Sequence, residues 1–405
     1  MINLELTPNL EETRKATRGL AEALFRPISR KYDRQEHAYP EELKALGGPR
    51  RKRTAEEIRE AEELKKLAKA QEKQNEGKIV NGSNLNGVVS VAEMCWGDVG
   101  LMLSIPGAGL GNAAISAVAT PEQKERFGHL YASMAITEPS AGSDSAGIQA
   151  TAFLDGDEWV INGEKIFITA GERSDAVVVW ATVDKSAGKA AIKSFVVPKD
   201  APGLEFVGLE NKLGLRASDT ATIRFDNCRV PKDNLLGDPE IKRGGGSFGG
   251  VMQTFDNTRP TVAAMAIGVA RASLDLTIEL LEKEGIKADY AKDVWQASAI
   301  QAELYRMETD WEAARLLTMK AAWMSDNKQA NSMEASMCKA KAGRVGNYIT
   351  LRCVELCGAM GYSETELLEK WARDSKILDI FEGTQQIQLL IVARRLLNKS
   401  SAELK

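Results

Sequence analysis

The chain has 405 residues, of which 43% are hydrophobic and 27% charged, and its formal net charge at pH 7 is −4. Because a single hydrophobic core rarely grows beyond about 250 to 300 residues, this length predicts two or three domains and excludes a small binding module. The composition is that of an ordinary globular protein. The small net charge predicts neither nucleic-acid binding nor attachment to an anionic membrane.

The N-terminal segment gives no indication of a targeting signal. Glutamates at positions 5, 11, 12 and 22 interrupt it, whereas a signal peptide needs an unbroken apolar run and a transit peptide is poor in acidic residues. We identify no stretch of the roughly 20 apolar residues that a membrane-spanning helix needs. We therefore expect a cytoplasmic protein with no membrane partner.

The cysteines favour reduced thiols over a disulfide framework, because five of them, an odd number, are scattered through a long chain. Cys353 and Cys357 lie four residues apart on one predicted helix face. The chain has only two histidines, however, so we predict no metal centre.

Residues 1–130 are predicted to form a helical domain. Apolar residues recur there at helical spacing in LEETRKATRGLAEALF and again in GVVSVAEMCWGDVGLMLSI. Between these runs, residues 49–78 consist mostly of Lys, Arg, Glu and Ala. Alternating charge at this density favours a solvated helix or a mobile excursion over a partner-binding site.

Residues 131–240 have a different character. Short β-branched runs such as AVVVWATV and SFVVP are separated by Asp-Gly, Asn-Gly and Pro-Gly turn signals, which predicts a small antiparallel β domain. Residues 241–405 contain four long amphipathic segments, which predict a helical bundle. The order of helices, then strands, then helices is an α+β multidomain arrangement and lacks the βαβ alternation of a doubly wound dinucleotide fold.

The glycine-rich run Gly244 to Gly250 has two interpretations. It has the flexibility of a phosphate-binding loop, but it lacks a preceding buried strand and a following Lys-Ser/Thr. A flexible entry to the next helix is therefore the favoured interpretation.

The run MAITEPSAGSD, Met134 to Asp144, carries the hydroxyls of Thr137, Ser140 and Ser143 in a loop made pliable by Gly142. Such hydroxyls, with the backbone amides beside them, suit the edge of a planar heterocycle rich in acceptors. Taken alone, an ordinary polar loop explains the run as well.

The run KIFITAG, Lys165 to Gly171, is predicted to place Phe167 and Thr169 on one strand face. That pairing offers a ring for stacking beside a hydroxyl for hydrogen bonding. The alternative is an aromatic residue of the core.

The run DIFEGTQQIQ, Asp379 to Gln388, carries a candidate base. Gly383 breaks the helical pattern and Thr384 is a good N-cap, so Glu382 is predicted to lie on a short loop between two buried helices. Burial against Phe381 would disfavour the charged carboxylate and raise its basicity. A solvent-facing glutamate is the alternative.

Together, in this order and at this spacing, the three runs resemble the acyl-CoA dehydrogenase family over nearly the whole chain. Further matches are NKLGLRASDTATIRFDNCRVP (Asn211 to Pro231), FDNTRP (Phe255 to Pro260) and CGAMGYSETELLEKWARDSKI (Cys357 to Ile377). The resemblance implies an N-terminal helical domain, a middle β-barrel and a C-terminal four-helix bundle. It also implies noncovalent FAD and electron transfer to an electron-transfer flavoprotein.

By residue match, the resemblance assigns roles to individual positions. Glu382 is the base that removes the α-proton of an acyl-CoA while hydride leaves the β-carbon. The substrate contacts are Ser143, Asp256, Asn257, Thr258, Arg259 and Gly383. The cofactor contacts are Met134, Ile136, Thr137, Ser143, Phe167, Ile168, Thr169, Thr384, Gln385 and Gln386.

The resemblance also bears on the alternatives. In the family, the backbone N–H of the base helps to stabilise the negative charge that develops on the thioester oxygen. Some branches carry the base at the position of Thr258, which cannot act as one here. A flavin-dependent oxidase or monooxygenase of the same fold is the first alternative. A non-catalytic flavin-binding or DNA-associated relative is the second, and both Glu382 and the net charge disfavour it.

The sequence departs from the family where a neighbouring subunit's FAD is held. KADYAK, Lys287 to Lys292, replaces an Arg-x-x-Phe-Gly-Lys run, and Glu355 and Ala359 alter a Gln-x-x-Gly-Gly run. A lysine is a weaker phosphate clamp than an arginine, and a carboxylate repels phosphate. We therefore predict a homotetramer or, favoured by these changes, an α2β2 heterotetramer with a paralogue. Residues 49–78 replace a loop that shapes the acyl pocket, so the sequence leaves the acyl group open.

Overall fold

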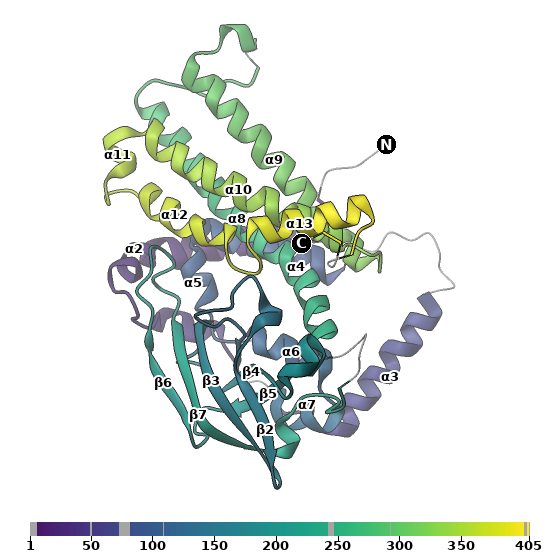
Figure 1. Cartoon of the computed structure of the whole chain (residues 1–405). Coiled ribbons are helices and arrows are strands. Elements are labelled where there is room, and N and C mark those ends of the chain that lie inside the picture. Colours follow the sequence, from purple (N-terminus) through teal and green to yellow (C-terminus); the bar gives the residue numbers. More distant parts are fainter. Residues whose placement is uncertain are drawn as a thin grey trace.

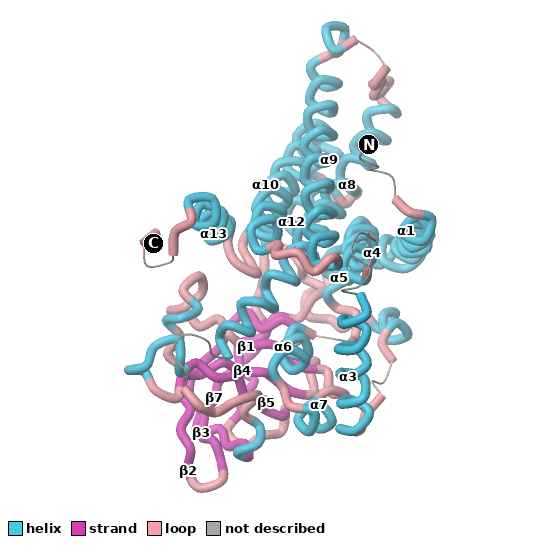
Figure 2. Tube along the Cα trace, turned by 90° about the vertical axis from the view of Figure 1, so that its right-hand side faces the viewer, coloured by secondary structure: helices cyan, strands magenta, loops and turns pink. Residues whose placement is uncertain are grey.

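The computed structural model of the chain describes residues 6–48, 51–72, 82–107, 109–241, 247–291, 293–400 and 403–404. Helices from both ends of the chain gather on one side of the molecule and a curled sheet lies on the other (Figure 1). The view turned by 90° shows the long C-terminal helices running side by side above the strands, while several helices of the N-terminal part lie beside the strands (Figure 2). The predicted class, a helical domain followed by a β domain and a helical domain, is confirmed.

The N-terminal part of the chain is helical, and Asp98 ends one of its helices and begins the next. Asp98, between two of these helices, caps the second by accepting a hydrogen bond from the Leu101 N–H at 2.8 Å. The helices are α1 (Pro8–Leu20), α2 (Arg26–Arg34), α3 (Ala55–Glu72), α4 (Ser83–Gly97), α5 (Val99–Leu103), α6 (Leu110–Val118) and α7 (Pro121–Phe127).

The charged segment predicted at 49–78 contains helix α3, which lies beside α7 (Figure 1). Arg59 pairs with Glu122, and Lys124 Nζ lies 2.7 Å from Glu62 Oε1. The predicted helix is therefore confirmed for Ala55–Glu72, with mostly exposed or part-exposed side chains over residues 55–64, and ion pairs attach it to the rest of the molecule. Residues 49–50 and 73–78 lie outside the described chain.

The middle domain is one seven-stranded sheet with the order β1-β4-β2-β3-β7-β6, and β5 pairs with β4. The prediction of a purely antiparallel sheet is wrong, because β1 and β2 each pair with β4 in parallel. The strands are β1 (Ala132–Ala135), β2 (Thr151–Asp155), β3 (Glu158–Thr169), β4 (Ala176–Thr182), β5 (Ile192–Pro198), β6 (Leu204–Leu209) and β7 (Thr220–Pro231).

Strand β4 explains why this sheet has two covered faces. Its sequence AVVVWAT is apolar up to Thr182 and buried at every position, which suits a strand between two cores rather than a strand with one wet face. Val177 and Val179 join one core and Val178 and Trp180 join the other, as the alternation of side chains along a strand requires.

The C-terminal domain is a bundle in which α8 and α10 form the centre of the main hydrophobic core. At Gly268 of α8 an added Cβ would lie 2.3 Å from the Ala92 carbonyl oxygen, so α4 can approach closely only because this residue is glycine. The helices are α8 (Ser247–Lys283), α9 (Ala299–Asp326), α10 (Ser332–Leu356), α11 (Gly358–Tyr362), α12 (Leu368–Ser375) and α13 (Gln385–Leu397).

Part of α8, Thr258–Lys283, is long and apolar enough to cross a membrane by length and composition, which the sequence analysis overlooked. In the fold, 72% of its most apolar window is buried inside the protein. The apolar run is therefore that of a core helix that contacts neighbours all round.

A buried charge cluster of Asp98, Lys370 and Asp374 joins the three domains. Lys370 Nζ lies 2.7 Å from Asp98 Oδ2 and 2.5 Å from Asp374 Oδ2, and all three side chains are at most 2% exposed. Ser29 of α2 donates to Asp98, and the Leu215 N–H of the β domain donates to Asp374 Oδ1 at 2.7 Å. Helix α12, which leads into the candidate base, is thereby fixed to both other domains.

Candidate active site

Glu382 lies on a short turn between a 3-10 turn (Lys376–Asp379) and helix α13, as predicted. Glu382 and Gly383 both adopt left-handed backbone conformations, with φ of 56° and 93°. The Thr384 hydroxyl accepts a hydrogen bond from the Ile387 N–H at 3.4 Å and caps α13, which confirms the predicted N-cap. A left-handed conformation is costly for a residue with a side chain, so the surrounding structure must hold this turn in place.

The Glu382 carboxylate has the environment of a base. The Thr258 hydroxyl donates a hydrogen bond to its Oε2 at 2.8 Å. Burial raises the pKa of Glu382 above its usual value, and the Thr258 hydrogen bond and the charges of Arg259 and Lys339 oppose part of that rise. A carboxylate with a raised pKa holds an abstracted proton more readily than a solvated one.

The backbone N–H of Glu382 is a free donor. In the described part of the chain it has no hydrogen-bond acceptor, whereas the carbonyl oxygens of Glu382 and Gly383 accept from the buried Gln388 amide at 3.1 and 3.2 Å. Backbone donors away from water are almost always paired, so this N–H is suited to a ligand oxygen. The turn thus presents a carboxylate and an N–H together.

The predicted cofactor loop follows the end of β1. The Ile166 N–H of β3 donates to the Thr137 carbonyl at 2.9 Å, so the structure brings the first and second predicted runs together. Met134 and Ile136 are partly buried and pack against a core cluster of the sheet. Ser143 is exposed beyond them.

The Glu138–Lys165 pair, which the sequence analysis did not identify, fixes this junction. Lys165 Nζ lies 2.8 Å from Glu138 Oε1 and 2.9 Å from the Ile136 carbonyl oxygen, and Lys165 is fully buried. Burial lowers the pKa of Lys165 to about 8, although Glu138 opposes the shift. A lysine inside the predicted strand WVINGEKIFIT was the available signal, because a charge within a buried strand needs a partner.

Phe167 presents its ring to solvent. Its backbone is left-handed, with φ of 56°, and the side chain is 59% exposed. A register shift in the β3–β7 pairing falls between Lys165 and Ile168, so the simple alternation behind the prediction of a shared Phe167 and Thr169 face does not hold. The Ile168 side chain is buried in the sheet core, which leaves only its backbone for a cofactor.

The other residues predicted to bind cofactor or substrate differ in their exposure and in their partners. Gln385, with its amide nitrogen toward Asp379, donates to that carboxylate at 2.6 Å, and Gln386 is exposed. Arg259 is buried, with its guanidinium 3.4 Å from the Ser336 hydroxyl. The side chains of Asp256 and Asn257 lie outside the described part of the structure.

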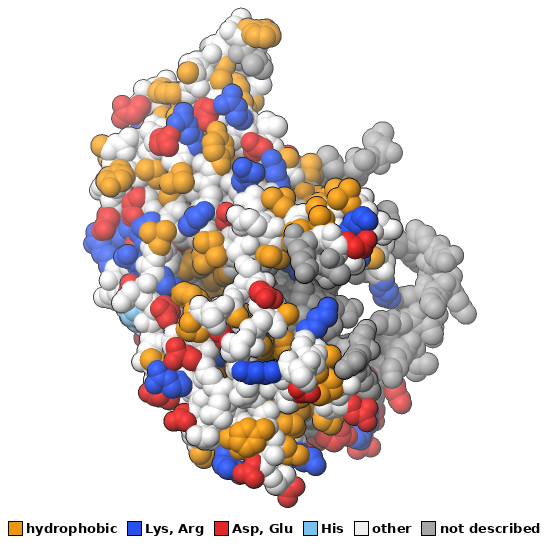
Figure 3. Space-filling view, in the orientation of Figure 1, with side chains coloured by type: hydrophobic (Ala, Val, Ile, Leu, Met, Phe, Trp, Pro, Cys, Tyr) orange, Lys and Arg blue, Asp and Glu red, His pale blue; other side chains and the backbone are white. Residues whose placement is uncertain are grey.

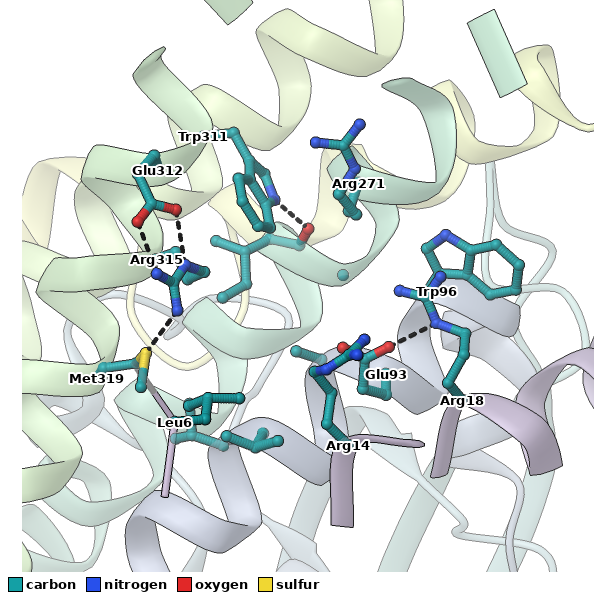
Figure 4. Close-up of a pocket in the computed structure, with 15 residues that line it drawn as sticks. Leu6, Arg14, Arg18, Glu93, Trp96, Arg271, Trp311, Glu312, Arg315 and Met319 are labelled. Atoms are coloured by element: carbon teal, nitrogen blue, oxygen red, sulfur yellow. Dashed lines mark hydrogen bonds and ion pairs between the residues drawn. The ribbon is translucent and has the colours of Figure 1, made fainter. Parts of the chain in front are cut away.

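A cavity of about 360 Å³ lies elsewhere, between α1, α4, α8 and α9 (Figure 4). Its walls include Trp96 and Trp311, and none of its lining residues belongs to the predicted site. Its four arginines are each paired with a carboxylate, so it offers no obvious anion site; the pairs are Arg14–Glu11, Arg18–Glu93, Arg271–Glu308 and Arg315–Glu312.

The chain was compared with protein families, curated proteins and solved structures. "Acyl-CoA dehydrogenase, C-terminal domain" matches residues 246–397, and "Acyl-CoA dehydrogenase, middle domain" matches residues 133–228. The short-chain specific acyl-CoA dehydrogenase of Bos taurus mitochondria is 34% identical over 406 residues, covering 98% of this chain and 92% of that protein. This chain belongs to the acyl-CoA dehydrogenase family.

Other acyl-CoA dehydrogenase relatives agree over the full length. The acryloyl-CoA reductase (NADH) of Anaerotignum propionicum is 31% identical over 98% of this chain and 97% of its own. The butyryl-CoA dehydrogenase structure from Megasphaera elsdenii superposes with a TM-score of 0.80 at 28% identity, covering 98% of this chain and all of that one. The predicted class, a FAD-dependent oxidoreductase acting on acyl-CoA, is confirmed.

The residues of the site fit FAD. Within the described part of the chain, the hydroxyls of Thr137, Ser143 and Thr169 have no hydrogen-bond partner, and the ring of Phe167 is largely uncovered. Free hydroxyls beside an exposed aromatic ring match a planar heterocycle with polar edges. These residues would hold the flavin.

Two of the four residues that depart from the family pattern, Tyr290 and Glu355, have side-chain partners within the chain. Tyr290 donates to Glu308 at 3.2 Å, and Lys287 and Ala359 are exposed. Glu355 pairs with Arg352, so its carboxylate is neutralised within the chain. The expected repulsion between Glu355 and a phosphate is therefore weaker than the sequence alone indicates.

Proposed function

We propose that this acyl-CoA dehydrogenase oxidises short-chain acyl-CoA thioesters and passes the electrons to an electron-transfer flavoprotein. The observation that carries the chemistry is the Glu382 turn, which holds a carboxylate of raised pKa beside an N–H that has no acceptor among the described residues. The short acyl group is supported by similarity to short-chain and butyryl-CoA enzymes. The choice of electron acceptor is supported by the family resemblance. It is also supported by a chain from a structure described as the electron transferring flavoprotein of Acidaminococcus fermentans, which superposes on this chain with a TM-score of 0.80 at 29% identity.

In this mechanism the chain's own residues manage the proton and the developing charge. The Glu382 N–H donates to the thioester carbonyl oxygen, where negative charge develops as the α-proton leaves. The Glu382 carboxylate takes that proton. The hydrogen bond that the Thr258 hydroxyl donates to Oε2 fixes the orientation of this carboxylate. FAD, when bound, supplies the acceptor for the hydride of the β-carbon.

An anaerobic titration tests this function directly. The purified protein should show a flavin spectrum, and the visible band should bleach fastest with butyryl-CoA in a panel that includes octanoyl-, palmitoyl- and sterol side-chain CoA thioesters. Bleaching by none of them would refute the proposal. Rapid recovery of the band in air, faster than with an electron-transfer flavoprotein, would instead support the oxidase alternative.

We also propose that the chain assembles as a tetramer, with a paralogue in an α2β2 arrangement rather than with copies of itself alone. Support comes from the altered Lys287 and Tyr290 and from apolar side chains exposed over the helical half of the molecule (Figure 3). Large exposed apolar patches mark interfaces. The most exposed members near the α10–α11 end are Tyr290, Trp295, Leu351, Met360 and Tyr362.

Expression of the chain alone separates the two assemblies. A yellow, active homotetramer with one FAD per subunit would refute the heteromeric proposal. Colourless or insoluble protein that becomes yellow on co-expression with a paralogue would support it, because the partner then supplies the phosphate contacts that this chain lacks.

A further inference from the structure

One face of α10 lies directly behind the Glu382 turn. Ser336, Lys339 and Gly343 are spaced three and four residues apart, so they share that face. Ser336 lies 3.4 Å from Arg259, and a Cβ at Gly343 would lie 3.0 Å from the Leu378 carbonyl oxygen. Helix α10 therefore contacts both segments that carry the reaction, and Lys339 is between these contacts.

Lys339 has an unusual environment for a lysine. It is 1% exposed, and its Nζ donates to the Gly383 carbonyl oxygen at 2.7 Å. Within the described residues no carboxylate lies within 4.0 Å of it, although it feels the charges of Asp379 and Glu382. Burial lowers its pKa to about 8. A buried ammonium held by a neutral acceptor costs stability, so packing alone does not explain a lysine here.

The contact falls on a turn that needs support. Glu382 is in a left-handed conformation that typically costs about 1 to 3 kcal/mol for a residue other than glycine. The carbonyls of Glu382 and Gly383 are drawn inward by Gln388, and the second of them also by Lys339. These hydrogen bonds restrain the backbone of the turn on both sides of the peptide bond between Glu382 and Gly383.

We propose that Lys339 is a positioning residue for the dehydrogenation: its ammonium holds the Gly383 carbonyl and so fixes the turn that presents the Glu382 carboxylate and N–H to the thioester. Its positive charge also favours the ionised form of the base. This inference rests on the proposed function. The other groups facing the Glu382 carboxylate are Thr258 and Arg259 from α8, and Asp379 faces Lys339 from the preceding turn.

Two substitutions separate the hydrogen bond from the charge. Lys339→Met removes both, whereas Lys339→Gln keeps an amide donor and removes only the charge. Lys341→Met is the matched control, because Lys341 lies on the same helix in a half-exposed pair with Asp310, 2.6 Å away. For each protein the FAD content, the melting temperature and the rate of flavin bleaching by butyryl-CoA are measured from pH 5 to 9.

We expect Lys339→Met to keep its FAD and to bleach about 10- to 100-fold more slowly, since small misplacements of a reacting group have effects of this size. Lys339→Gln should retain more of the rate. In both variants the acidic limb of the pH profile should move to higher pH, because the base loses a stabilising positive charge. Lys341→Met should match the wild type in every measurement.

Each remaining outcome decides against the inference or against the function beneath it. FAD-loaded Lys339 variants with the wild-type rate and an unmoved acidic limb would overturn the inference. So would loss of FAD or of folding in both variants, since Lys339 would then serve stability. If none of the acyl-CoA thioesters bleaches the flavin of the wild type, the proposed function fails instead, whatever the variants do.

Discussion

Replacing Lys370 by methionine tests whether the buried charge cluster holds the three domains together. Lys370→Met leaves Asp98 and Asp374 buried at 0% exposure with no cation between them. Removing one partner of a buried pair typically costs about 3 to 5 kcal/mol. With an unfolding entropy of roughly 2.1 cal/mol/K per residue, about 0.85 kcal/mol/K for 405 residues, the melting temperature should fall by about 4 to 6 °C.

The pH dependence of this loss has a definite sign. Burial raises the pKa of Asp374, and Lys370 opposes that rise. Without Lys370 the folded-state pKa of Asp374 moves further above its unfolded value. The variant therefore loses stability relative to the wild type as the pH rises through that range. The difference in melting temperature should be larger at pH 8 than at pH 5.

Differential scanning fluorimetry of holoprotein at the two pH values measures both effects. Lys283→Met is the control, because Lys283 pairs with Glu279 at the same four-residue spacing but is 62% exposed. Such a solvent-exposed pair contributes little to stability. A fall of less than 1 °C in Lys370→Met, or a difference that does not change with pH, would refute the reasoning.

Further predictions concern the site and its support. Glu382→Gln should keep its FAD but bleach with butyryl-CoA at least 10²-fold more slowly, since an amide cannot take the α-proton; near-wild-type bleaching would contradict the assignment. In the wild type the bleaching rate should rise with pH, and the midpoint of the rise should lie above the usual pKa of a glutamate, because burial raises the pKa of Glu382. A midpoint at the ordinary glutamate pKa would argue against Glu382 as the buried base. Asp219→Asn should lower the melting temperature more than Arg216→Ala. Asp219 is buried and accepts a hydrogen bond from the Glu172 N–H at 3.1 Å, whereas Arg216 is part-exposed. A larger fall in melting temperature for Arg216→Ala would be inconsistent with these contacts.

The sequence predicted those features of the site that depend on local chemistry. Thr384 is a cap because its hydroxyl reaches an N–H three residues along, and Gly383 permits a conformation that most residues avoid. Both effects lie within one short run. The raised pKa of Glu382 was predicted for a similar reason, since apolar residues adjoin it in sequence.

Contacts between distant segments were not predictable in this way. Lys165 meets Glu138 across 27 positions, Lys339 meets Gly383 across 44, and Lys370 meets Asp98 across 272. Each lysine occurs within a run whose local pattern indicates only a strand or a helix. The parallel pairing of β1 with β4 has the same origin, because the alternation within a strand does not name its neighbour.

The attachment of α3 has a practical consequence for anyone handling the protein. Besides the buried Ile58, the contacts that tie this helix to α7 include the Arg59–Glu122 and Lys124–Glu62 ion pairs, and these side chains are at least partly exposed. Between 0.1 M and 1 M salt the Debye length shrinks from about 10 Å to about 3 Å, so exposed ion pairs weaken. Raising the ionic strength is thus a means of loosening this helix, and buffers of moderate salt preserve the arrangement described above.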